Sequence, residues 1–265
     1  MIRKMIESER EAILEFLYME PEINLYLIEE VYHFDECNKH QEIYVETIND
    51  DYFTIVSRNW SNVIYYAVDP AFNEAWISVL KSFDFLFISA KTHLIELIHP
   101  YFPAMEEDRM IFMRSTTFTP DKNIDYNDVE ILETKEEAAE VYDLLLSVEE
   151  LYTVHQKSRK EYIEYLYYNS GENGTTVYVR RNGRIVATAS AVFETKKSAM
   201  IVSVATHKDS RKQGHGRKVM HYLMDYYVNQ KKKTLCLYYD DPRAEKLYLN
   251  LGFIDIYKWS MLYTP

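Results

Sequence analysis

Glycine is scarce in this sequence and is confined to one end of it. Only 6 of the 265 residues are glycine, and all six follow residue 170. A loop that wraps closely around phosphate groups normally depends on glycine, because a residue without a Cβ lets the backbone adopt left-handed dihedrals and approach a ligand. The first 170 residues therefore exclude a glycine-based phosphate loop, and any such loop lies in the remainder.

Cysteine and long apolar runs are also scarce. The two cysteines, Cys37 and Cys236, lie far apart and match no metal-ligand spacing, so we expect a reduced, cytoplasmic compartment and no bound metal. The longest apolar run, near Phe83–Ala90, is far shorter than the roughly 20 residues that span a bilayer. The first ten residues lack the apolar core of a signal peptide. We therefore expect a soluble protein with no membrane partner.

Positive charge is scarce in the first half of the chain. Residues 1–125 contain 10 Lys or Arg against 23 Asp or Glu, a net charge of −13, whereas residues 126–265 contain 20 against 19, a net charge of +1. Nucleic-acid binding depends on neutralising phosphates, so we expect no nucleic-acid partner. One interpretation of this negative charge is an acidic surface that keeps the protein soluble. The alternative is an acidic surface at the entrance of a site, which would favour a cationic substrate.

Length and hydrophobic periodicity predict two α/β domains. The chain exceeds one typical domain, and with 47% apolar residues it can bury two cores. The polar, proline-containing segment Thr119–Asp128 predicts a linker, which divides the chain into domains 1–122 and 123–265. In the first domain we expect helices at about 8–19, 23–32, 72–81 and 92–100 and strands at about 42–47, 52–57, 63–68, 85–89 and 109–118.

The second domain has the clearer pattern. We expect helices at about 135–148, 158–168, 217–229 and 242–251, and strands at about 129–132, 176–180, 184–193, 198–205, 235–239 and 253–262. Asn182-Gly183 between two strands is a strong hairpin signal. Asp241 and Pro242 suit the start of a helix, and Gly252 suits its end.

Residues 201–218 combine a strand, a polar loop and a helix start. The apolar run Ile201–Ala205 leads into Arg211-x-x-Gly214-x-Gly216, and a helical pattern follows at once. The first amides of a helix lack intrahelical partners and carry the positive end of the helix dipole, so this arrangement favours an anion. Lys208–Lys218 contains five Lys or Arg and one Asp, a local charge of +4. Cations in a first helical turn are disfavoured by the dipole unless an anion is present, which favours ligand binding here.

Two motifs identify a family resemblance. Residues 129–264 resemble the GNAT superfamily of acyl-CoA-dependent N-acyltransferases through Arg211-x-x-Gly214-x-Gly216 and through Ala244-x-x-Leu247-Tyr248-x-x-x-Gly252-Phe253. Either motif alone is a weak signal, but both occur in the family's order and on the expected elements. The resemblance implies a mixed, mostly antiparallel central sheet flanked by helices. The order of elements in the first half is compatible with a second, diverged copy of the same fold in tandem.

The resemblance also implies how acetyl-CoA would bind. In the family, the end of the fourth strand pairs with the pantetheine arm, amides of the following loop hold the pyrophosphate, and a residue before the last helix contacts the cofactor. No metal is involved. The matching residues here are Val204, Ala205 and Thr206 on the strand, Arg211, Lys212, Gln213, Gly214, His215, Gly216 and Arg217 in the loop, and Asp241 before the helix.

Tyr248 is the candidate catalytic residue. In the family the matching tyrosine lies beside the thioester sulfur and is proposed to protonate the leaving thiolate. A phenol has an ordinary pKa near 10 and so carries a proton at neutral pH. The alternative is an aromatic side chain that packs in a C-terminal helix, and this chain has 24 tyrosines.

The sequence departs from the family at two places. The family often has Asn at the position of Asp241, whose carboxylate cannot donate the same hydrogen bond and equally suits a helix cap. Several members carry a glutamate base on the fourth strand, but residues 198–206 contain no acid. The base is therefore unassigned: Glu149, Glu150, Glu194 and His207 are candidates, and water or an amine that arrives uncharged would also serve.

These observations predict an enzyme that transfers an acetyl group from acetyl-CoA to a primary amine of a small molecule or peptide, acting as a monomer or homodimer. A non-catalytic CoA-binding sensor or interaction protein on the same fold is the alternative. The missing strand acid and Asp241 favour that alternative. A nucleotide-binding P-loop is disfavoured, because the chain lacks Gly-x-x-x-x-Gly-Lys-Ser/Thr.

Overall fold

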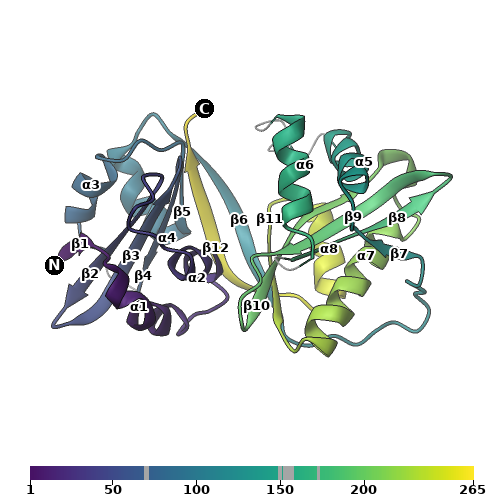
Figure 1. The fold of residues 1–265 in the computed structure, drawn as a ribbon, viewed down its shortest axis with the longest axis horizontal. Coiled ribbons are helices and arrows are strands. Elements are labelled where there is room, and N and C mark those ends of the chain that lie inside the picture. Colours follow the sequence, from purple (N-terminus) through teal and green to yellow (C-terminus); the bar gives the residue numbers. More distant parts are fainter. Residues whose placement is uncertain (69–71, 149–150, 152–157, 172–173) are drawn as a thin grey trace. The chain divides into compact units, whose positions relative to one another are not determined.

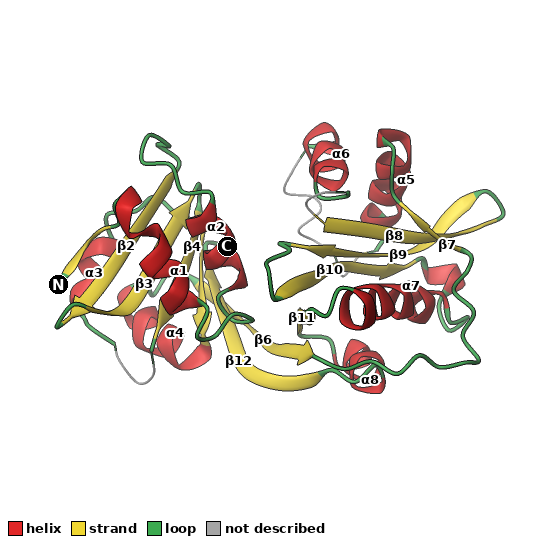
Figure 2. Ribbon diagram, turned by 60° about the horizontal axis from the view of Figure 1, so that its bottom comes forward, coloured by secondary structure: helices red, strands yellow, loops and turns green. Residues whose placement is uncertain are grey.

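The computed structural model describes residues 1–68, 72–148, 151, 158–171 and 174–265. It divides into two compact units. Unit 1 comprises Met1–Phe112 together with Asp255–Pro265, and unit 2 comprises Met113–Ile254. Figure 1 follows the chain through both units, and Figure 2 shows that each contains a sheet with helices against it.

Unit 1 is a sheet flanked by helices. Its strands follow the order β1-β2-β3-β4-β5-β12-β6. Neighbours from β1 to β4 are antiparallel, β4 and β5 are parallel, and β5 and β12 are antiparallel. The strands are β1 (Ile2–Lys4), β2 (Gln41–Ile48), β3 (Asp51–Asn59), β4 (Asn62–Ala67), β5 (Phe87–Lys91), β6 (Glu106–Ser115) and β12 (Ile254–Tyr263), and the helices are η1 (Glu7–Glu9), α1 (Arg10–Leu17), α2 (Leu25–Tyr32), α3 (Ala75–Leu80), α4 (Thr92–Ile98) and η2 (His99–Tyr101).

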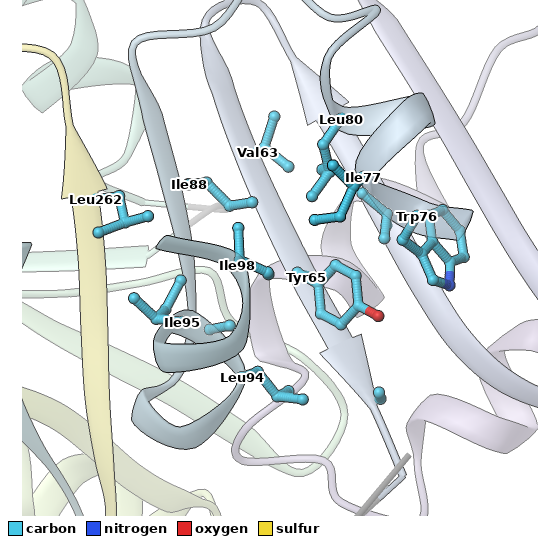
Figure 3. Close-up of a cluster of buried hydrophobic side chains, with 13 residues drawn as sticks. Val63, Tyr65, Trp76, Ile77, Leu80, Ile88, Leu94, Ile95, Ile98 and Leu262 are labelled. Atoms are coloured by element: carbon cyan, nitrogen blue, oxygen red, sulfur yellow. The ribbon is translucent and has the colours of Figure 1, made fainter. Parts of the chain in front are cut away.

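The last strand of the chain belongs to unit 1. Residues Trp259–Tyr263 of β12 pair with β5. Leu262 is fully buried in the core that α3 and α4 form with the sheet, where Trp76 and Leu94 are also buried (Figure 3). The expected second domain, 123–265, included this strand, whereas the compact units assign residues 255–265 to the first. Alternating apolar residues indicate that a segment is a strand, but they do not indicate which sheet it joins.

Unit 2 is likewise built of β-strands flanked by helices. Its strands follow the order β11-β10-β9-β8-β7, and only β10 and β11 are parallel among the pairings described in this unit. Its strands are β7 (Val129–Ile131), β8 (Gly174–Arg181), β9 (Arg184–Val192), β10 (Ser198–Thr206) and β11 (Thr234–Tyr239), and its helices are α5 (Lys135–Leu146), α6 (Arg159–Tyr168), η4 (Lys208–Ser210), α7 (His215–Met224), the π-helical turn η5 (Asp225–Gln230) and α8 (Pro242–Asn250).

Local sequence signals explain where several of these elements begin. Thr134 accepts a hydrogen bond from the amide of Glu137, whose side chain bonds back to the amide of Thr134, and Ser158 forms the same capping box with Glu161 at α6. Asn182 has φ +50° and Gly183 has φ +76°, the left-handed pair that a tight β8–β9 hairpin requires.

Both units share one succession of elements. Each has a strand, two helices, three antiparallel strands, a helix, a strand parallel to the third of these, and a further helix. The predicted fold class, a mixed and mostly antiparallel sheet flanked by helices, is confirmed. The short strand β1 was not predicted. None of the described helices is both long enough and apolar enough to cross a membrane.

Candidate functional site

The end of β10 carries a bulge. The pairing of β10 with β9 shifts register between Val202 and Ala205, and Ser203 has φ +55°. The pairing with β11 covers only the start of β10 and ends at Met200. Neither ladder therefore pairs Ser203 or Val204, which leaves backbone groups available to a ligand beside this part of the strand.

The two glycines of the loop are required for different physical reasons. Gly214 precedes α7 with φ +83°, and no atom lies within 4 Å of a Cβ built on it, so the backbone conformation is what requires glycine. A Cβ on Gly216 would lie 2.9 Å from Oγ1 of Thr206, so here the requirement is close packing of the first turn of α7 against the end of β10. The strand end and the helix N-terminus are thereby held together.

Two cations in the first turn of α7 have counter-ions within the protein. Nη2 of Arg217 lies 3.2 Å from Oδ2 of Asp121, and Nζ of Lys218 lies 2.9 Å from Oδ1 of Asp128. The expectation that these cations need an external anion is therefore wrong for Lys218, which also does not line the cavity described next. The sequence offered no local signal of these pairs, because the partners lie 96 and 90 residues away.

One cavity in unit 2 joins the strand end, the loop and α8. Its volume is about 890 Å³. It is lined by eleven of the twelve residues expected at the site, namely Val204, Ala205, Thr206, Arg211, Lys212, Gly214, His215, Gly216, Arg217, Asp241 and Tyr248. Gln213 is the exception, since its side-chain amide donates to the carbonyl oxygen of Asp209, 3.0 Å away, and so stabilises the loop from within.

The cavity has residues that sequence reasoning missed. They are Val148, Leu151, Ser210, Arg243, Lys246 and Asn250, together with the motif residues Ala244 and Leu247. Arg243, Lys246 and Asn250 recur at helical spacing on α8, which is the signal that identifies them once that face of the helix is known. The lining contains five cations (Arg211, Lys212, Arg217, Arg243 and Lys246) and one acid (Asp241), a formal charge of +4.

Tyr248 lies in α8 with its ring enclosed. It is 7% exposed, and its ring contacts those of Tyr239 and Phe253 at centroid distances of 6.2 and 6.0 Å. Burial, and then the negative charges of Asp240 and Asp241, raise the pKa of Tyr248 to about 12. Within the described part of the chain its hydroxyl has no hydrogen-bond partner. The phenol is therefore protonated at neutral pH and its proton is available to a molecule in the cavity.

Asp241 acts as the cap of α8. Its Oδ1 accepts from the backbone amide of Arg243 at 2.8 Å, and its Oδ2 lies 2.7 Å from the Arg243 guanidinium. The side-chain hydrogen bond from Arg243, followed by the backbone one, lowers the pKa of the Asp241 carboxyl. The carboxylate is thus ionised and engaged, and it is poorly suited to accept a proton from a substrate.

His215 has a buried ring at the start of α7. It is 8% exposed, and its Nδ1 is buried with no partner among the described residues. Burial, followed by the positive charges of Arg181 and Lys218, lowers the pKa of His215, so the imidazole is neutral at pH 7. The side chain adds no charge to the cationic lining.

The structure places two of the candidate bases in other roles. Glu194 bonds to Lys231 and Lys233 at 2.8 and 2.6 Å and does not line the cavity. Burial raises its pKa, but these two partners bring the pKa of Glu194 below its ordinary value. His207 accepts from the amide of Asp209 at 3.3 Å and caps the short helix η4. Glu149 and Glu150 lie outside the described residues.

In unit 1 the corresponding region holds an ion pair between the protein's own side chains. The pairing of β4 with β5 ends at Ile64 and Ser89. Beyond that point Lys91, which is 3% exposed, lies 3.2 Å from Glu20, and Tyr66 and Tyr257 donate to the same carboxylate at 2.7 and 3.1 Å. This unit also contains no glycine, so nothing in it corresponds to the loop before α7.

No metal site is evident in the parts of the chain that the structure describes, since no group of three or more His, Cys, Asp or Glu residues is placed to hold an ion.

Residues 138–253 match the family model described as the acetyltransferase (GNAT) family. This range contains the bulged strand, the loop and Tyr248. No curated protein matches the chain in sequence.

Several solved structures share the fold across almost the whole chain. A Drosophila protein has a TM-score of 0.71 at 13% identity and covers 99% of this chain and 98% of its own. A GNAT-family acetyltransferase from Colwellia psychrerythraea has a TM-score of 0.61 at 12% identity, with 99% of each chain covered. A tandem GNAT protein from the clavulanic acid biosynthesis pathway has a TM-score of 0.61 at 10% identity and covers 99% of this chain and 97% of its own. At these identities the likeness establishes the fold.

Proposed function

We propose, from the membership of residues 138–253 in the acetyltransferase (GNAT) family, that this protein transfers an acetyl group from acetyl-CoA to a primary amine of a small molecule or peptide. The observation that carries the proposal is the single cavity in which the bulged end of β10, the N-terminus of α7 and the hydroxyl-bearing side chain of Tyr248 meet. An anion site, an extended strand edge and a proton donor are the parts that an acyl-CoA reaction needs.

The residues fit the donor chemically. The first amides of α7, behind Gly214 and Gly216, suit a diphosphate, and the formal charge of +4 on the lining offsets its negative charge. Because Gly216 has no Cβ, the first turn of α7 can pack closely against Thr206 at the end of β10. The unpaired backbone groups at Ser203 and Val204 suit the amides of a pantetheine arm.

The chemistry balances without a further reactant. The amine nitrogen attacks the thioester carbonyl carbon, a C–N bond forms and the C–S bond breaks. The nitrogen loses one proton to solvent, and the departing sulfur takes one proton from solvent while it accepts a hydrogen bond from Tyr248, so the products are an amide and a free thiol. An amide near Val204 would stabilise the negative charge that develops on the carbonyl oxygen.

The hydroxyl of Tyr248 donates a hydrogen bond to the thioester sulfur of acetyl-CoA. Its pKa of about 12 lies above that of a thiol, about 8.5, so the phenol donates a hydrogen bond as charge develops and does not lose its proton outright. Burial strengthens this hydrogen bond, because the hydroxyl competes with little water.

A non-catalytic CoA-binding protein is the second candidate. Asp241 is the one acidic side chain among the described residues that line the cavity, and it is already engaged as a helix cap. The described lining therefore offers no carboxylate base for an acceptor that arrives as an ammonium ion.

Calorimetry and a thiol-release assay separate these candidates. We expect acetyl-CoA to bind with a stoichiometry of one per chain, since unit 1 has no counterpart of the loop, and we expect thiol release with at least one member of a panel of primary amines. Binding without thiol release across amino acids, polyamines, aminoglycosides and peptides would favour the non-catalytic candidate. Absence of binding at high micromolar acetyl-CoA would reject both.

A further inference from the structure

Two lysine side chains that line the cavity have no partner among the described residues. The ammonium groups of Lys212, in the loop, and Lys246, on α8, form no ion pair or hydrogen bond with any residue that the structure describes, and both lysines line the same cavity. The other cations differ. Arg217 pairs with Asp121 and Arg243 pairs with Asp241, so part of the charge of the lining is balanced by the protein itself.

The backbone at Lys212 is strained. Its φ is +62°, in the left-handed region that a residue with a Cβ enters at a cost. Strain of this kind persists where the surrounding structure enforces it, and here it holds a lysine at the wall of the cavity. The loop thus places a cation there in addition to the amides that follow it.

Lys246 extends the cationic lining to α8. It lies one helical turn from Arg243 and one from Asn250, and all three line the cavity. The loop and the start of α8 are close together, since the positive charge of Arg211 contributes to the lowered pKa of the Asp241 carboxyl. A ligand anchored at the N-terminus of α7 is therefore within reach of cations on α8.

A diphosphate alone does not account for this arrangement. The amides and dipole at the start of α7 already suit a diphosphate. Coenzyme A carries, in addition, a phosphomonoester on its ribose, with a charge of about −1.5 to −2 at neutral pH. Lysine is a compact point charge that suits such a group, particularly where no carboxylate of the protein competes for it.

We propose that Lys212 and Lys246 form a second phosphate subsite, which binds the phosphomonoester on the ribose of the acyl-CoA donor. This rests on the proposed function, because it requires coenzyme A in the cavity. Such a subsite would favour a free acyl-CoA over an acyl group on the phosphopantetheine of a carrier protein, because that phosphopantetheine is attached through a phosphodiester and has no ribose phosphate.

The test compares coenzyme A with dephospho-coenzyme A, which lacks only the phosphomonoester, by titration calorimetry. For the natural sequence we expect dephospho-coenzyme A to bind about tenfold more weakly, as befits the loss of a charge-assisted contact. Lys246→Ala should weaken coenzyme A about fivefold and leave dephospho-coenzyme A unchanged. The matched control is Lys196→Ala, an exposed lysine on the turn before β10 that lies outside the cavity lining, and it should change neither affinity.

The outcomes are distinguishable. Equal affinity for both ligands in the natural sequence, or an equal loss for both in Lys246→Ala, would overturn the subsite and leave the proposed function intact. If the natural sequence binds neither ligand, the proposed function fails and the subsite with it. A circular dichroism spectrum and a melting curve of each variant confirm that the exposed substitutions leave the fold intact.

Discussion

Nη2 of Arg217 lies 3.2 Å from a carboxylate oxygen of Asp121, so a cation that lines the cavity is paired with a residue of the segment that precedes β7. The Arg217 side chain is 44% exposed and that of Asp121 is 33% exposed, so the pair is in contact with solvent. A negative charge at this position opposes the approach of an anionic ligand to the start of α7.

Removing this charge should tighten the binding of coenzyme A. We expect Asp121→Asn to increase the affinity about two- to threefold, since exposed ion pairs contribute less than about 1 kcal/mol. Calorimetry at about 0.05 M and 0.15 M salt measures the change, which should shrink at the higher salt. Asp143→Asn, which removes a carboxylate paired with Arg159 outside the cavity lining, is the control. Weaker binding by Asp121→Asn would show that Asp121 positions Arg217 for the ligand.

Loss of the Tyr248 hydroxyl should affect turnover more than binding. We expect Tyr248→Phe to lower kcat about 100-fold and to change the Kd for acetyl-CoA by less than about twofold, because the phenol acts on the sulfur only as charge develops. Tyr226→Phe, on the π-helical turn outside the cavity lining, should retain full activity. An unchanged kcat in Tyr248→Phe would remove this residue from the mechanism.

The last strand should stabilise unit 1 although it follows the site of unit 2 in sequence. All three tryptophans, Trp60, Trp76 and Trp259, lie in unit 1, so tryptophan fluorescence reports the unfolding of this unit. We expect Leu262→Ala to lower its free energy of unfolding by about 3 kcal/mol, as for a fully buried leucine. Ile254→Ala, at a residue that is 55% exposed, is the control and should have little effect. A fluorescence transition unaffected by Leu262→Ala would argue against this assignment of β12.

Unit 1 should become less stable as the pH rises towards neutrality. Burial, partly offset by the nearby Ser57 and by a hydrogen bond from Asn59, raises the pKa of Glu30 from 4.5 to about 7. The folded state therefore retains a proton that the unfolded state releases, so this contribution is complete below about pH 4.5 and is lost as the pH passes through about 7.

The comparison of Glu30→Gln with the natural sequence isolates this effect. We expect the variant to match the natural protein at about pH 4 and to exceed its stability by about 2 kcal/mol at about pH 8, measured by urea unfolding with tryptophan fluorescence. Glu11→Gln, at an exposed position of α1, should show no such difference. A pH-independent difference for Glu30→Gln would assign the change to packing.

Much of the fold was predictable because its signals are local. Capping residues at Thr134 and Ser158, the Asn182-Gly183 turn and the alternation of apolar residues mark elements within a few positions of themselves. The strand β1 was missed because a three-residue strand is too short to show a period. Composition predicted a linker at Thr119–Asp128, but this segment lies within unit 2, and composition gave no sign of its ion pairs with α7.

The residues of the candidate site also fall into those that local sequence signals predicted and those that depend on tertiary packing. The glycine spacing and the tyrosine motif could be found from the sequence, because the backbone at Gly214 and the contact of Gly216 depend on residue type at fixed positions. Lys246 was missed, since only the packing of α8 determines which of its faces lines the cavity. Lys218 was grouped with the ligand-facing cations until the structure paired it with Asp128.

The sequence by itself determined the elements, the conformation of the loop before α7 and the residue types able to bind an anion, because these depend on dihedral preferences and on periods of a few residues. Only the tertiary structure decided that β12 pairs with β5 in unit 1, that Arg217 and Lys218 have internal counter-ions, and that Lys212 and Lys246 line one cavity with side chains that have no partner among the described residues. Those relationships join residues that are far apart in the chain, and they depend on which distant segments pack together rather than on any local preference.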